Sequence, residues 1–243
     1  MNEHQVGKRQ FLRHVCGGAA LGATMLIGNA RAATGSKTTL TAQQALNLLK
    51  EGNAKYLTES PVQAVEGKKR RLEIALGQSP MAVLVSCSDS RVPPELLFGR
   101  GLGELFIVRN AGNTVDTVAQ GSIEYAVAQL GVPLIVVMGH ERCGAVDAAV
   151  SVVEKNLSFP GSIGKMIEPI IPAVLSAQAA TPKKGSASRE ALVDAAVRAN
   201  VSRVVERLRK DQAMLLEPLR AKRLMVVGAR YDLDDGKVDF FDI

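Results

Sequence analysis

Residues 81–92 read Met-Ala-Val-Leu-Val-Ser-Cys-Ser-Asp-Ser-Arg-Val, a short apolar run that ends in polar residues. A continuous apolar run of this length predicts a strand that is buried on both faces of a sheet. Similar runs recur at 105–108, 134–138 and 224–228. The stretches between the runs carry apolar residues at helical spacing. Strands that alternate with helices predict an α/β fold, with a mainly parallel, short β-sheet flanked by helices.

The expected helices extend beyond the strand region. Thr41-Ala42-Gln43-Gln44 has the pattern of a capping box, and helical spacing continues from it to about Tyr56. Further helices are expected over residues 70–76, 116–130, 145–155, 163–177 and 188–210. An edge strand is expected over 237–243, and a flexible loop over 181–188. With no internal repeat, these elements predict one domain over residues 33–243.

Residues 1–32 have the order of a secretory signal peptide. Three basic residues precede an uncharged stretch at 15–27, and residues 30–32, Ala-Arg-Ala, form a small-x-small cleavage site. Lys8-Arg9 resembles the twin-arginine export motif, with Lys in place of the first Arg. Both the twin-arginine and the general secretory route therefore stay open. We expect the export machinery to deliver residues 33–243 to the periplasm or otherwise outside the cytoplasm.

Charge and composition argue against two classes of partner. The net charge is +6, but four of the 30 basic residues and one of the 24 acidic residues lie in 1–32. The remainder is close to neutral and has no basic stripe interleaved with aromatics, so nucleic-acid binding is not expected. Residues 33–243 also contain no apolar run of the length that a membrane span needs.

Loss of residues 1–32 would leave one histidine, His140, and two cysteines, Cys87 and Cys143. Any chemistry that needs imidazole or thiol must use these three residues. Cys87 ends one predicted strand, and His140 and Cys143 follow the end of another. Ligands bind at the carboxyl ends of the strands in open α/β sheets, so we expect the three side chains to share one edge.

Two thiolates and one imidazole form a soft ligand set that prefers zinc. Three protein ligands leave the fourth tetrahedral position to water, as in catalytic zinc sites, where zinc lowers the pKa of that water to about 7. Asp89 and Arg91 follow Cys87 at alternate positions. A carboxylate there can orient the water, and a guanidinium beside it can hold the carboxylate away from the metal.

Residues 87–92 (Cys-Ser-Asp-Ser-Arg-Val) and 140–145 (His-Glu-Arg-Cys-Gly-Ala) resemble the two signature segments of the β-class carbonic anhydrases. Residues 109–113 (Arg-Asn-Ala-Gly-Asn) and 124–127 (Glu-Tyr-Ala-Val) also match that family's pattern. The resemblance covers roughly residues 40–243. It implies a zinc enzyme that reversibly hydrates carbon dioxide to bicarbonate and a proton by means of zinc-bound hydroxide.

The resemblance also implies roles for single residues. Cys87, His140 and Cys143 would bind one Zn²⁺ per chain, and Asp89 and Arg91 would form the catalytic dyad. In a closed form known in the family, Asp89 would take the fourth zinc position.

The family resemblance further implies a substrate pocket and an oligomer. Gln78 would bind bicarbonate, while Phe106 and Tyr125 would line a small apolar pocket, often across a dimer interface. The family fold has an exchanged N-terminal helical arm, and the helix at 41–56 fits that arm. A homodimer or a higher even oligomer is implied. From the residues alone, ordinary core packing is the simpler role for the two aromatics.

Two departures and several alternatives accompany this prediction. The chain has no Trp, so a second bicarbonate pocket built on Trp is not expected. Glu141 replaces the family's usual Ser or Thr, and we expect it to be a solvated charge.

The alternatives to carbon dioxide hydration are hydrolysis of small linear sulfur compounds such as carbon disulfide, a non-catalytic zinc- or bicarbonate-binding role, and thiol redox chemistry of Cys87 and Cys143. A resting disulfide between these cysteines is a further alternative.

Overall fold

The computed structural model describes residues 36–58, 66–180 and 188–242. The predicted signal peptide at 1–32 and most of the predicted loop at 181–188 lie outside these ranges. Within them, no helix has both the length and the apolar character that a membrane crossing requires.

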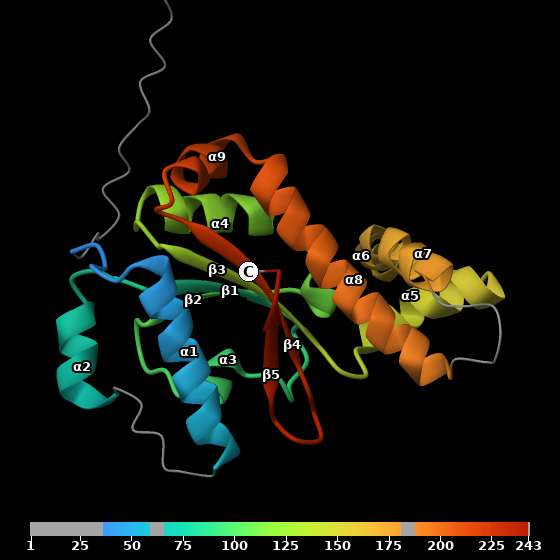
Figure 1. Ribbon diagram of the computed structural model, residues 1–243, viewed down its shortest axis with the longest axis horizontal. Helices are drawn as coiled ribbons and strands as arrows, with labels where there is room; N and C mark the ends of the chain where they lie inside the picture. The colour runs from blue at the N-terminus through green and yellow to red at the C-terminus, as the bar shows by residue number, and fades with distance from the viewer. Residues whose placement is uncertain (1–35, 59–65, 181–187, 243) are drawn as a thin grey trace, which may run out of the picture. The chain divides into compact units, whose positions relative to one another are not determined.

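The centre of the fold is a five-stranded sheet in the order β2-β1-β3-β4-β5 (Figure 1). Four strands are parallel: β1 (Ala82–Ser86), β2 (Leu105–Arg109), β3 (Leu134–His140) and β4 (Met225–Tyr231). The fifth, β5 (Val238–Phe241), is an antiparallel edge strand. The predicted α/β class with a mainly parallel sheet is confirmed.

Helices cover both faces of the sheet. The side chains of Val83, Val85 and Ile135 face α4 (Thr117–Ala128), α8 (Arg189–Lys210) and α9 (Ala213–Arg220). The alternate side chains, which include Leu84 and Val136, face α1 (Ala42–Leu57) and α3 (Pro94–Leu97). The burial of both faces explains why the strands read as continuous apolar runs.

A third group of helices packs beside the sheet. It contains α5 (Gly144–Lys155), α6 (Gly161–Ile167), α7 (Ile171–Ala180) and the first half of α8, as Figure 1 shows. Cys87 and Cys143 belong to the buried cluster at its centre. The short helix α2 (Gly67–Ile74) has no buried residue.

Local sequence signals account for most helix boundaries. The predicted capping box is present, because the Thr41 hydroxyl accepts from Gln44 and the Gln44 side chain accepts from the Thr41 backbone. Asp116 and Ser188 cap α4 and α8 in the same position. Gly131 follows α4 with φ of 70°, as expected of a glycine after a helix end.

The structure departs from the predicted elements in three places. The single helix over 163–177 is α6, a 3₁₀ turn (Glu168–Ile170) and α7, because Pro169 and Pro172 lack the N–H groups that a continuous helix needs. The sequence did not predict α3 or α9, which contain prolines at their first position and in their interior. His140 was expected beyond β3 but is its last residue, since the ladder with β4 continues to Tyr231.

Candidate metal centre

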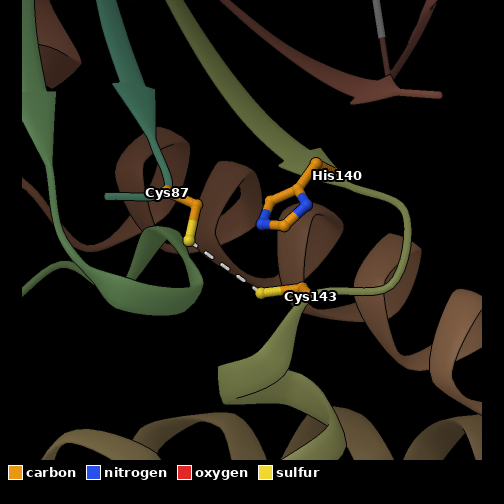
Figure 2. A group of neighbouring side chains, drawn as sticks. All are labelled: Cys87, His140 and Cys143. Carbon is orange, nitrogen blue, oxygen red and sulfur yellow. Dashed lines mark hydrogen bonds between the residues drawn. The ribbon is translucent and has the colours of Figure 1, made fainter. Parts of the chain in front are cut away.

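The topology brings Cys87, His140 and Cys143 together at the carboxyl edge of the sheet. Cys87 directly follows β1, His140 ends β3, and Cys143 immediately precedes α5. Because β1 and β3 are parallel neighbours, their carboxyl ends meet. One ligand atom from each residue lies within 4.8 Å of the others, and all three side chains are buried (Figure 2). The expected juxtaposition is therefore present.

The two ring nitrogens of His140 differ in their hydrogen bonding. Its Nδ1 lies 2.8 Å from the carbonyl oxygen of Glu141, which can only accept a hydrogen bond, so the proton resides on Nδ1. Its Nε2 is fully buried and has no hydrogen-bond partner in the described part of the chain. A buried imidazole nitrogen with a free lone pair, fixed by a carbonyl on the opposite nitrogen, is the usual arrangement of a metal-ligating histidine.

The thiols of Cys87 and Cys143 lie close to each other and to His140 Nε2. Their Sγ atoms are 4.0 Å apart, and neither cysteine is in a disulfide. Hydrogen bonds, above all the one from Cys143 and also that from the Gly112 N–H, lower the pKa of Cys87 against the opposing effect of burial. Hydrogen bonding to Cys87 and burial raise the pKa of Cys143. Together with the lone imidazole nitrogen, the two thiols form a donor set that fits a soft divalent cation such as zinc.

Arg109, the last residue of β2, holds the chain that carries Cys87. Its guanidinium donates to the carbonyl of Cys87 at 2.8 Å and to that of Asp89 at 2.6 Å. We did not predict this contact, although Arg109 stands in a segment that matches the family pattern. The contact fixes the backbone between the first ligand and the neighbouring carboxylate.

Asp89 and Arg91 form a closely paired dyad beside the ligands. The Arg91 side chain donates to both carboxylate oxygens, at 2.9 and 2.8 Å, and its backbone N–H donates to Oδ1 at 3.0 Å. These bonds hold the pKa of Asp89 well below its usual range. Asp89 Oδ2 also lies 3.8 Å from His140 Nε2. The carboxylate therefore borders the ligand cluster while Arg91 engages both of its oxygens.

The predicted substrate-binding residues lie on other segments. Gln78 is exposed, in the segment before β1. Phe106 on β2 and Tyr125 on α4 are half-buried, with ring centroids 6.4 Å apart and a 37° angle between the rings. The two aromatics are thus brought together, and they pack against the core in the way that the simpler alternative describes.

A charged network on the far side of His140 was not predicted. Glu141 was expected to be solvated, but its Oε2 accepts from the Leu233 N–H at 3.1 Å and its Oε1 lies 3.1 Å from Arg142. Arg142 also pairs with Asp234 in the β4–β5 turn at 2.6 Å. Asp232 completes a group of three carboxylates, which form ion pairs with Arg142 and Arg230. The network ties the ligand loop to that turn.

Comparison with known proteins gives a consistent result. A family model described as carbonic anhydrase matches residues 82–238. The carbonic anhydrase of Mycolicibacterium smegmatis is 38% identical over 79% of this chain and 89% of that protein. Carbonic anhydrase 2 of Mycobacterium tuberculosis is 38% identical over 78% of this chain and 87% of that protein.

Solved structures agree with the sequence comparison. The β-carbonic anhydrase CafA of Aspergillus fumigatus superposes with a TM-score of 0.62 and 27% identity, over 82% of this chain and 90% of that chain. One of two tetrameric β-carbonic anhydrases of Sordaria macrospora gives 0.61 and 27%, over 71% and 85%. With its parallel sheet and its Cys-His-Cys cluster, the chain belongs to the β-class carbonic anhydrases and is an enzyme of the carbonate dehydratase type.

Proposed function

We propose that this carbonic anhydrase interconverts carbon dioxide and bicarbonate with one zinc ion per chain, held by Cys87, His140 and Cys143. The observation that carries the proposal is that the buried Nε2 of His140, which lies among two buried thiols, has no hydrogen-bond partner among the residues that the structure describes. Buried polar atoms nearly always have a partner, and a metal ion in this site would supply one.

Each neighbouring residue has a part in the proposed reaction. Cys87, His140 and Cys143 would hold the zinc ion, which would supply a Lewis acid that lowers the pKa of a coordinated water to about 7. Asp89 accepts a hydrogen bond from the reacting water and orients it. Arg91 keeps the carboxylate ionised and, by engaging both of its oxygens, keeps it from becoming the fourth ligand. The geometry of this pair supports an open site, because a closed one would require Asp89 to give up these bonds.

We propose that buffer molecules remove the proton that hydration releases. Residues 33–243 contain no histidine besides His140, which is used as a ligand. The Arg91 hydrogen bonds hold the pKa of Asp89 well below its usual range, so that carboxylate is a weak base for relaying the proton. Turnover should therefore rise with buffer concentration at constant pH and ionic strength. A rate that stays constant across a buffer series would contradict this proposal.

We propose that a second copy of the chain completes the substrate pocket, in a homodimer or a higher even oligomer. The β-carbonic anhydrases of Sordaria macrospora are described as tetrameric. The helix α2 buries no residue of its own, and Leu72 within it and Leu76 just after it are 64% and 85% exposed. Apolar side chains presented in this way favour coverage by another subunit. Gln78 would then meet Phe106 and Tyr125 across the interface to hold the substrate.

We propose that residues 1–32 direct export and that residues 33–243 act in the periplasm or otherwise outside the cytoplasm. The order of charges, apolar residues and small residues supports this location. Cell fractionation of the full chain, with determination of the N-terminus of the product, tests it. A product that begins at Met1 in the cytoplasm would contradict it.

The first experiment is carbon dioxide hydration by purified residues 33–243, with zinc measured in the same sample. We expect activity with about one zinc per chain and loss of both in Cys87→Ala. Zinc without hydration would favour a sulfur substrate, which assay with carbon disulfide would reveal, or a binding role. A metal-free protein with a disulfide between Cys87 and Cys143 would overturn the zinc proposal.

A further inference from the structure

The long helix α8 carries one polar residue in its buried apolar stripe. Asn200 is only 2% exposed and lies among Val197, Val201 and Val204, which are also buried. Asparagine is a poor helix former, and burial of its amide without a hydrogen bond is costly. Its presence at this position therefore indicates a specific polar contact.

That contact reaches the loop beside the metal ligands. The Asn200 amide donates to the carbonyl oxygen of Gly112 at 2.9 Å, in a fully buried setting. Gly112 in turn donates its own N–H to the Sγ of Cys87 at 3.2 Å. A chain of two hydrogen bonds thus connects the middle of α8 to a ligand sulfur, although the hydrogen bond that Asn200 donates goes to neither a ligand nor the dyad.

The residue between them has little freedom to move. Gly112 has φ of 68°, and a Cβ added to it would lie 2.7 Å from the Ile170 Cδ1 and 3.1 Å from the Ala145 Cβ. Since its N–H and its carbonyl belong to one residue of fixed conformation, anchoring the carbonyl also fixes the direction of the N–H. The helix itself is closely seated, because Val197 and Val201 leave no room for a Cβ at Gly139, next to His140.

An N–H donor on a ligand sulfur changes what that sulfur can do. The hydrogen bond stabilises the thiolate and withdraws electron density from it, which leaves a bound metal more electron-poor. We propose that Asn200 is a positioning residue that, through Gly112, holds this N–H on Cys87 and thereby sets the metal affinity and the electronic character of the centre. This inference rests on the proposed zinc site.

The test replaces the amide with an apolar group of similar size, Asn200→Leu, and uses Asn200→Ala as a second variant that cannot overfill the site. The matched control is Val204→Ala, which removes buried atoms one turn further along α8. In each protein, zinc affinity is measured by competition with a chelator. The thiolate-to-metal charge-transfer band is recorded after substitution with cobalt(II), and thermal unfolding is followed without metal.

We expect both Asn200 variants to bind zinc about 10- to 100-fold more weakly and to shift the charge-transfer band. Val204→Ala should unfold at a lower temperature but keep the affinity and the band of the unsubstituted protein. Unchanged affinity and an unchanged band in both Asn200 variants would overturn the inference while leaving the zinc site intact. If the unsubstituted protein binds neither zinc nor cobalt, the proposed zinc site fails, and this inference fails with it.

Discussion

Replacement of Gly112 by alanine should destabilise the metal-free protein strongly. The residue has φ of 68°, a conformation that costs an L-residue such as alanine about 1–2 kcal/mol. The added Cβ would also lie 2.7 Å from the flexible end of Ile170 and 3.1 Å from the less mobile Cβ of Ala145. Overpacking of this kind costs about 1–3 kcal/mol. The free energy of unfolding should therefore fall by about 2–5 kcal/mol, which is a large part of the roughly 5–15 kcal/mol that a typical domain has.

Urea unfolding of metal-free protein measures this loss without any contribution from zinc. The matched control is Gly144→Ala, because Gly144 also neighbours a ligand cysteine but begins α5 in a helical conformation with nothing within 4 Å of an added Cβ. Its free energy of unfolding should change by less than about 1 kcal/mol. If Gly112→Ala is no more destabilising than Gly144→Ala, the argument from backbone conformation and close packing is refuted.

Three further predictions address the dyad, the charged turn and the thiols. Arg91→Ala should lower the kcat of carbon dioxide hydration about 10- to 100-fold at unchanged zinc content, because Asp89 loses its partner; an unchanged rate would contradict the role of the dyad. The hydrogen bond from Arg230 lowers the pKa of Asp232 from 3.8 to about 2. The ion pair therefore stabilises the folded protein above about pH 4, and this stabilisation is lost as the pH falls toward 2. Asp232→Asn should therefore flatten the dependence of metal-free stability on pH between 4 and 2, and an unaltered slope would exclude the pairing. After a chelator has removed the metal, a mild oxidant should form a disulfide between Cys87 and Cys143, whose sulfurs are 4.0 Å apart. A thiol titration of zinc-loaded protein should still find both thiols. Equal oxidation of both forms would count against the proposed ligand set.

The strands and the ligand cluster were predictable because each depends on a local signal. Apolar runs identified β1, β2 and β3, and their order along the chain placed Cys87 and His140 at adjacent strand ends. The prolines that divide 163–177 were visible as well, but their effect on a helix competes with the apolar spacing around them. Packing against the rest of the fold decides such cases, and local spacing does not report it.

The surroundings of the cluster were not predictable for a different reason. The hydrogen bond from Arg109 to the Cys87 carbonyl joins residues 22 positions apart, and the one between Asn200 and Gly112 joins residues 88 positions apart. Neither contact has a spacing rule, because each depends on how a helix or strand end meets a loop in three dimensions. The same holds for Glu141, whose partners Leu233 and Arg230 come from the far end of the chain.

The placement of the ligands on two strands has a consequence for folding. Cys87 and Cys143 are 56 positions apart, and the chain between them includes β2, α4 and β3. Closing a loop of that length costs about 3–4 kcal/mol of chain entropy in the unfolded state. In an unfolded chain, His140 and Cys143 are therefore near enough to bind a metal ion together, and Cys87 joins them when β1 and β3 have paired. A metal ion with three protein ligands would thus mark chains whose central strands are already in register, and its binding energy would favour that register over every slipped alternative.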